Sequence, residues 1–95
     1  MAVTLCVLLW ANEGAERDLI AYEDRVLRLV HDYGGEIVQR LRPFGGSDDP
    51  AEIQVLTFPS EAAFDRFMED PRRTAMSRLR DAAVARTQVF RVERV

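Results

Sequence analysis

Four segments of the chain carry the hydrophobic patterns of β-strands. Residues 3–10 (VTLCVLLW) form an apolar run, residues 52–58 (EIQVLTF) alternate between two faces, and residues 36–44 and 87–95 show weaker patterns of the same kind. A strand that is apolar on both sides has to be covered on both sides. Pro43, near the end of the second segment, indicates an edge strand, because proline cannot donate a ladder hydrogen bond.

Two helical segments lie between these strands. The first follows a turn at residues 12–14 and is ended by Gly34-Gly35, and its Asp24 and Arg28 are spaced for an ion pair. The second has Ser60 as its expected N-cap and is divided at Asp70-Pro71, where Asp70 is placed to cap the second part. The side chains expected to face the sheet are Leu19, Tyr22, Val26, Leu27, Leu29, Val30 and Tyr33 in the first helix, and Phe64, Phe67, Met68, Ala75, Met76, Leu79, Ala82 and Ala83 in the second.

The resulting order of elements, β-α-β-β-α-β, predicts the fold. Crossover connections within one sheet are right-handed, so both helices fall on the same side of it. We therefore expect a single α+β domain over residues 1–95, a ferredoxin-like two-layer sandwich with a four-stranded antiparallel sheet and two helices on one face.

The opposite face of this sheet is expected to be apolar as well. Leu5, Val7 and Leu9 lie on one side of the first strand and Cys6, Leu8 and Trp10 on the other, and in the third strand Ile53 and Val55 oppose Leu56 and Phe58. Whichever set faces the helices, the remaining set leaves a large apolar patch, and such patches usually mark an interface. The pattern therefore predicts a homodimer whose sheets pack face to face.

Composition excludes several classes of partner. The 95 residues carry a net charge of −3, and all 13 basic residues are arginine, so we expect neither nucleic acid nor an anionic membrane as a partner. RNA-binding RRM domains share this order of elements, but the middle strands here are aliphatic except at their ends. The single Cys6 rules out an internal disulfide and fits a cytoplasmic location, and the opening apolar run is too short to cross a bilayer.

No motif points to a metal or a cofactor. The sequence has no glycine-rich phosphate loop, CxxC, HExxH or GxSxG pattern, and it has one histidine. We therefore expect no metal site and no cofactor.

Two titratable side chains on the first helix are candidate proton acceptors. Glu23 lies inside the apolar arc of that helix, so its carboxylate is either desolvated, with a raised pKa suited to acid–base catalysis, or directed into a cleft. The alternative is a structural carboxylate that reaches water or pairs with an arginine such as Arg72. His31 lies on the border of the same arc, where a histidine is ordinarily half-exposed.

Two arginines of the second strand are a candidate anion site. Arg40 and Arg42 are two residues apart, so they share a strand face and are spaced to hold a carboxylate with both side chains. Charged residues on an edge strand also prevent edge-to-edge aggregation, which we regard as the better interpretation.

Several stretches resemble one known family. Residues 33–38 (YGGEIV), residues 53–60 (IQVLTFPS), and then Ala63, Phe67 and Asp70-Pro71 resemble the domain-of-unknown-function family 1330 of the dimeric α/β-barrel superfamily. The resemblance covers nearly the whole chain, and the Phe-Pro-Ser turn before a helix is its most specific part. It implies a dimer that closes a barrel, with a small-molecule cleft between each sheet and its helices. Relatives in the superfamily include cofactor-free oxygenases, haem-degrading enzymes, lactone isomerases and members with no known catalysis.

The resemblance adds three candidate substrate-binding residues. Tyr22 matches a tyrosine that the family tends to keep on the first helix, although a core aromatic residue is an equal alternative. Trp10 and Asn12 end the first strand, where the resemblance implies the mouth of the cleft, and some barrel oxygenases use an Asn and a Trp to bind substrate and oxygen. Packing and turn formation are the alternatives for these two residues.

These observations lead to two hypotheses of function. The first is a dimeric α/β-barrel protein that binds a hydrophobic or aromatic small molecule and acts as a cofactor-independent monooxygenase or isomerase, with Glu23 or His31 as the proton acceptor and with Tyr22, Trp10, Asn12 and Arg40 as substrate-binding residues. The second is a non-catalytic dimer that binds a ligand or a protein partner, in which Glu23 is a structural carboxylate.

Overall fold

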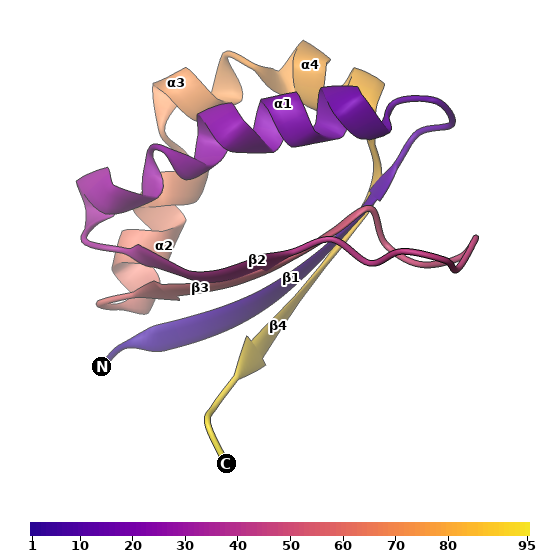
Figure 1. Cartoon of the computed structure of the whole chain (residues 1–95). Helices are drawn as coiled ribbons and strands as arrows, with labels where there is room; N and C mark the ends of the chain where they lie inside the picture. Colours follow the sequence, from indigo (N-terminus) through magenta and orange to yellow (C-terminus); the bar gives the residue numbers. More distant parts are fainter.

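The computed structural model describes residues 1–95 and contains one four-stranded antiparallel sheet. Its strands are β1 (Val3–Ala11), β2 (Glu36–Leu41), β3 (Glu52–Phe58) and β4 (Val84–Val92), in the order β2-β3-β1-β4 (Figure 1). This is the predicted ferredoxin-like arrangement, with the first and third strands in the middle of the sheet. The predicted edge position of β2 is also confirmed.

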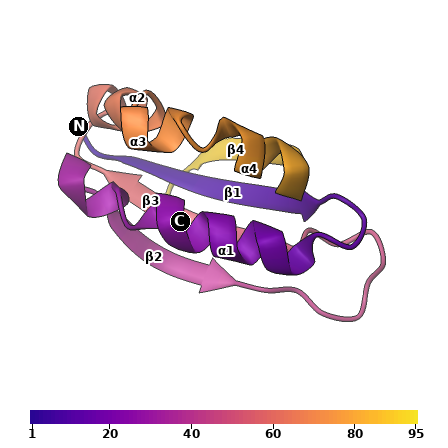
Figure 2. The same ribbon diagram turned by 90° about the horizontal axis from the view of Figure 1, so that it is seen from above.

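All helices lie on one side of the sheet (Figures 1 and 2). They are α1 (Glu16–Leu27), the 3-10 helix η1 (Val30–Tyr33), α2 (Glu61–Met68), α3 (Pro71–Thr74) and α4 (Ser77–Ala83). The predicted caps are present: the Ser60 hydroxyl accepts a hydrogen bond from the Ala63 backbone N–H at 3.0 Å, and the Asp70 carboxylate accepts one from that of Arg72 at 2.7 Å. No helix combines the length and the hydrophobicity that crossing a bilayer requires.

The core lies between the helices and one face of the sheet. In β1 the odd-numbered residues from Val3 to Leu9 are buried under the helices, and in β3 the even-numbered residues from Glu52 to Phe58 are. The predicted inward arc of the first helix is confirmed, since all seven residues are buried except the half-buried Tyr33. Alternation with a period of two therefore separates a helix-covered face from an open face.

The other face of the sheet carries a group of apolar side chains, and no helix of the chain covers it (Figure 1). We use the name open face for the following side chains: Cys6, Leu8, Val38, Leu41, Ile53, Val55, Phe90 and Val92. Val38, Leu41, Phe90 and Val92 are among the most exposed large hydrophobic side chains of the protein, and the others are partly buried. The predicted second apolar face therefore exists.

The structure corrects the predicted strand ends. β2 stops at Leu41 rather than at Phe44, because Leu41 pairs with Ile53 and its partner strand β3 begins only one residue before that, at Glu52. β4 runs over 84–92 rather than 87–95, since α4 passes into it directly at Ala83.

Two expectations for the helices are wrong. Ala75, Leu79 and Ala82 are exposed, because the chain restarts a second time at Met76 and the 100° periodicity does not carry across two short helices. Asp24 does not pair with Arg28 within its helix but lies 2.6 Å from the Arg40 guanidinium of β2, which is a partner distant in sequence.

Candidate functional site

A pocket lies between the helix-covered face of the sheet and helices α1, α2 and α4. Its volume is about 80 Å³, and ten of its fifteen lining residues are hydrophobic. Val7 and Leu9 of β1 form the middle of its floor, with Leu56 of β3 on one side and Val89 of β4 on the other. An apolar chamber with a few polar side chains is the usual composition of a small-molecule site.

Glu23 of α1 is the carboxylate of this pocket. Its side chain is 6% exposed, and its Oε1 accepts a hydrogen bond from the Gln54 amide at 2.7 Å. The other carboxylate oxygen has no hydrogen-bond partner in the protein. Desolvation by the surrounding apolar side chains raises the pKa of Glu23, the negative charge of Glu52 adds to this, and the Gln54 hydrogen bond opposes it. A carboxylate of this kind takes a proton more readily than an exposed one.

Gln54 and Glu52 connect Glu23 to an ion cluster at the edge of the sheet. The Gln54 amide nitrogen donates to Glu23 and also to Glu52, at 2.6 Å, and both β3 residues are only 2% exposed. Arg40 holds Glu52 through two hydrogen bonds of 2.7 and 3.0 Å. Glu52 is therefore an ion-paired structural carboxylate, whereas Glu23 faces the pocket.

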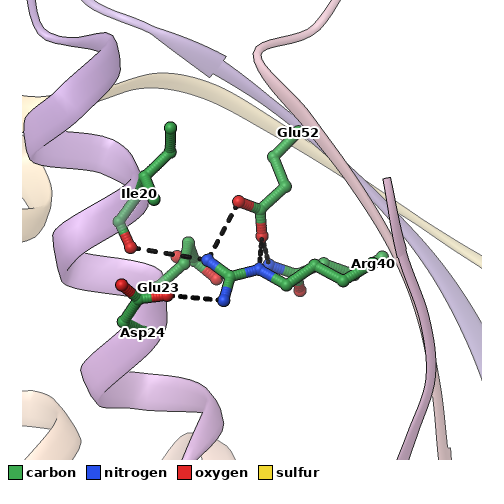
Figure 3. Close-up of polar contacts among 6 residues, drawn as sticks. Ile20, Glu23, Asp24, Arg40 and Glu52 are labelled. Carbon is green, nitrogen blue, oxygen red and sulfur yellow. Dashed lines mark hydrogen bonds and ion pairs between the residues drawn. The ribbon is translucent and has the colours of Figure 1, made fainter. Parts of the chain in front are cut away.

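Figure 3 shows that the Arg40 guanidinium donates hydrogen bonds to several acceptors within the protein. Besides Glu52, its guanidinium donates to the Asp24 carboxylate at 2.6 Å and to the Ile20 carbonyl oxygen at 3.4 Å, both on α1. These contacts hold β2 against α1 on the side of the pocket that Glu23 lines. Arg40 does not line the pocket, and its donors are directed to protein acceptors.

Tyr22 lines the same pocket one residue before Glu23. The ring is 4% exposed, and its buried hydroxyl makes no hydrogen bond with any protein atom. Burial raises the pKa of this hydroxyl, the nearby charge of Glu23 acts in the same direction, and Arg73 and Arg80 act against it. A buried polar atom without a partner is uncommon in folded proteins and often marks a functional position.

Two arginines line the pocket, Arg73 of α3 and Arg80 of α4. Arg73 donates to the Met68 carbonyl oxygen at 3.1 Å, but its buried Nε has no protein partner. Arg80 makes a long contact of 3.5 Å with the Thr87 hydroxyl and lies 3.7 Å from the exposed Asp81 carboxylate. The pocket thus has one carboxylate, Glu23, and two guanidinium groups; the charge of Arg73 opposes the rise in the pKa of Glu23, and Arg80 contacts β4.

The structure brings together only some of the predicted catalytic and substrate-binding residues. Tyr22 and Glu23 both line the pocket, whereas His31 is exposed on η1. Trp10 lies on the other side of the sheet, with its indole N–H donating to the Asp48 carbonyl oxygen at 3.1 Å and its ring under Arg86. The Asn12 amide donates to two carbonyl oxygens at the end of α4, at 2.9 and 3.0 Å, so it caps that helix.

Sequence reasoning missed the other polar residues of the pocket. A signal for one of them exists, because Gln54 shares the inward face of β3 with Leu56 and Phe58, and a polar residue at such a position needs a partner. Arg73 and Arg80 carry no such signal, since arginines are common on helices. No group of three or more His, Cys, Asp or Glu side chains is arranged to hold a metal ion.

Similar folds occur in several solved structures. A protein of unknown function from Rhodopseudomonas palustris is 20% identical, with a TM-score of 0.78 over 99% of this chain and 82% of that one. SnoaB, a cofactor-independent oxygenase from Streptomyces nogalater, is 15% identical, with a TM-score of 0.71 over 99% and 95%. A dimeric protein of unknown function and ferredoxin-like fold from Bacteroides fragilis is 11% identical, with a TM-score of 0.70 over 97% and 95%. At these identities the likeness shows the fold alone.

Comparison at the level of sequence identifies the family. No curated protein matches the sequence. The model of a domain of unknown function, DUF1330, matches residues 13–95, which include every polar residue of the pocket described above. The chain therefore belongs to the domain-of-unknown-function family 1330, as its YGGEIV and IQVLTFPS segments predict.

Proposed function

We propose that this protein is a homodimer that binds a hydrophobic or aromatic small molecule between sheet and helices and takes a proton from it through Glu23. The observation that carries the proposal is the buried Glu23 carboxylate, which has one oxygen without a protein partner in the wall of an apolar pocket. The reaction class would be an isomerisation, or a cofactor-independent oxidation in which molecular oxygen accepts the electrons of the deprotonated substrate, since both begin with removal of a proton from the substrate.

The surroundings of Glu23 suit a general base. The raised pKa of Glu23 lies closer to neutral pH, where a carboxyl group both accepts and releases a proton efficiently. The hydrogen bond from Gln54 fixes the orientation of the carboxylate and leaves its second oxygen for the substrate. The likeness in fold to SnoaB supports this reaction class without assigning a substrate.

The open face supports the homodimer. Four of its side chains, Val38, Leu41, Phe90 and Val92, are between 41% and 48% exposed in the single chain. Burying such a patch against a second copy removes apolar surface from water at roughly 25 cal/mol per Å². The Bacteroides fragilis relative is described as dimeric, which is consistent with this arrangement.

Substitution of Val55 tests the dimer. Val55 lies on the open face of the inner strand β3, so Val55→Arg is expected to give a monomer in size-exclusion chromatography with light scattering, whereas the wild type elutes as a dimer. Leu79→Arg is the matched control, because Leu79 is an exposed leucine of α4 on the helix side. A wild-type protein that stays monomeric at micromolar concentration contradicts the homodimer.

Mass spectrometry and one isosteric substitution test the catalytic role. Protein purified from its native host is examined for a co-purified small molecule, and turnover of that molecule is then compared between wild type and Glu23→Gln. We expect the variant to lose at least a hundredfold in kcat, because general base catalysis contributes about that much or more. Glu16→Gln, at an exposed position in the first turn of the same helix, is the control. Unchanged turnover in Glu23→Gln removes Glu23 as the base.

One observation favours the non-catalytic alternative. Gln54 shares one amide group between Glu23 and Glu52, so Glu23 is part of a structural network as well as of the pocket wall. On this second hypothesis the dimer binds a ligand or a partner and releases it unchanged. Binding that survives Glu23→Gln, together with an absence of product from the wild type, supports it.

A further inference from the structure

The two arginines of the pocket differ from the arginines that are held by two hydrogen bonds to one carboxylate. Arg40, Arg72 and Arg91 each direct two nitrogens at a single carboxylate within the chain, at distances between 2.7 and 3.1 Å. Neither Arg73 nor Arg80 has such a partner. A guanidinium at the wall of a water-poor apolar chamber is strongly attracted to an anionic oxygen.

The unpaired donors gather in one part of the pocket. The buried Nε of Arg73 and the buried hydroxyl of Tyr22 have no protein partner, and Arg80 has only long contacts. All three side chains line the same chamber. The two buried donors, on Tyr22 and Arg73, are costly to leave without acceptors, and a bound acceptor removes this cost.

Glu23 is the only carboxylate of the pocket. Glu23 is held above Gln54 of β3, whereas Arg80 contacts Thr87 of β4. β1 separates these two strands, so the floor spans two strand spacings, roughly 10 Å. An anionic ligand would place its charged group at Arg80, over β4, and its apolar part over Val7 and Leu9.

The volume limits the size of that apolar part. A cavity of about 150 Å³ accommodates benzene, and this pocket measures about 80 Å³. By this comparison the enclosed part holds roughly three or four carbon atoms, with the charged group at the arginine end.

We propose that the ligand of this pocket is a short-chain carboxylate of roughly four to six carbons, whose anionic group is recognised by Arg73, Arg80 and the Tyr22 hydroxyl and whose carbon chain lies over the apolar floor. This inference rests on the proposed small-molecule function and narrows it to one class of ligand. The pocket therefore distinguishes an acid from a neutral molecule of the same shape.

Titration of the wild-type protein with matched acids and amides tests this inference. Butanoate and 3-methylbutanoate are compared with butanamide and 3-methylbutanamide by two-dimensional amide NMR at neutral pH. We expect both acids to shift the signals of residues around the pocket, Val89 and Thr87 among them, and to bind at least tenfold more tightly than the amides, since a charge-assisted hydrogen bond is worth about that factor. Benzoate, whose ring exceeds the enclosed volume, is expected to bind more weakly than 3-methylbutanoate.

Variants locate the anion site. Arg80→Gln and Arg73→Lys are each expected to weaken binding of 3-methylbutanoate about tenfold and to leave binding of its amide unchanged. Arg78→Gln is the matched control, because Arg78 is an exposed arginine of the same helix outside the pocket. Arg73→Lys retains the positive charge, and Arg80 is partly exposed, so both variants are expected to fold.

The outcomes separate this inference from the proposed function. Equal binding of acids and amides in the pocket overturns anion recognition and leaves a neutral-ligand site. Tighter binding of benzoate than of 3-methylbutanoate overturns the size limit. Signal changes confined to surface arginines outside the pocket overturn the assignment of the site. Absence of binding by every compound counts against both this inference and the small-molecule function.

Discussion

Removing the hydroxyl of Tyr22 is expected to stabilise the free protein. The oxygen is buried and makes no hydrogen bond within the protein, so folding strips it of water without replacing the lost hydrogen bonds. Such a group costs roughly 1–3 kcal/mol, and Tyr22→Phe keeps the ring that packs against the core. We expect a gain of about 1 kcal/mol in the free energy of unfolding, which for a domain of this length raises Tm by about 4–8 °C.

The same chemical change at Tyr33 is the control. The Tyr33 hydroxyl donates to the Asp70 carboxylate, which also accepts from Arg72, so Tyr33→Phe removes a hydrogen bond to a charged group and is expected to lower Tm. Urea and thermal unfolding, followed by circular dichroism at one fixed protein concentration, measure both variants against the wild type. Most substitutions destabilise, which makes a gain at Tyr22 diagnostic.

Two results would refute this reasoning. If Tyr22→Phe lowers the free energy of unfolding by more than about 0.5 kcal/mol, the hydroxyl has a hydrogen-bond partner in solution. Substitutions that remove no interaction usually change the free energy of unfolding by less than this amount. A gain in stability accompanied by unchanged binding of 3-methylbutanoate means that the hydroxyl is not part of the anion site. The expected pair of effects is higher stability together with weaker binding of the acid.

Three further predictions concern Glu23, Arg40 and Gly35. Burial raises the pKa of Glu23 in the folded state above that in the unfolded state. The favourable contribution of Glu23 to the free energy of unfolding is therefore fully present below pH about 4.3, and it is lost as the pH rises through the pKa of the folded state. The stability of Glu23→Gln relative to wild type should therefore increase between pH 4 and pH 8, by about 1.4 kcal/mol for each unit of pKa shift, and a flat difference contradicts the raised pKa. Arg40→Met leaves the buried Glu52 without its cation and should cost roughly 2–3 kcal/mol in urea unfolding, less than a fully buried pair because Arg40 is partly exposed; an unchanged midpoint shows that the pair adds nothing. Gly35→Ala places a methyl group 2.9 Å from the Thr57 carbonyl oxygen and should destabilise the protein by about 2 kcal/mol or more. If the variant has the same Tm as the wild type, the backbone relaxes at this position.

Hydrophobic periodicity along the chain is sufficient to predict the architecture of this protein. The alternation in β1 and β3 and the apolar arc of α1 encode which side of each element is buried, and right-handed crossovers leave one arrangement of the helices. The cap positions at Ser60 and Asp70 are equally local, because each requires a side chain only two or three residues from the N–H it accepts. Glu23 can also be identified from the sequence, since a carboxylate within the apolar arc of a helix is unusual whatever its partner is.

The composition of the pocket depends on contacts between residues far apart in the chain. Arg40 and Glu52 meet on neighbouring strands, and Gln54 reaches Glu23 across 31 positions, so no local pattern reveals which carboxylate is ion-paired and which faces the pocket. Trp10 and Asn12 are close in sequence to the expected cleft, but the pleat directs Trp10 to the opposite sheet face and the end of α4 engages Asn12. The roles of individual polar side chains thus follow from strand register and helix placement, which are properties of the packed molecule and not of any one segment.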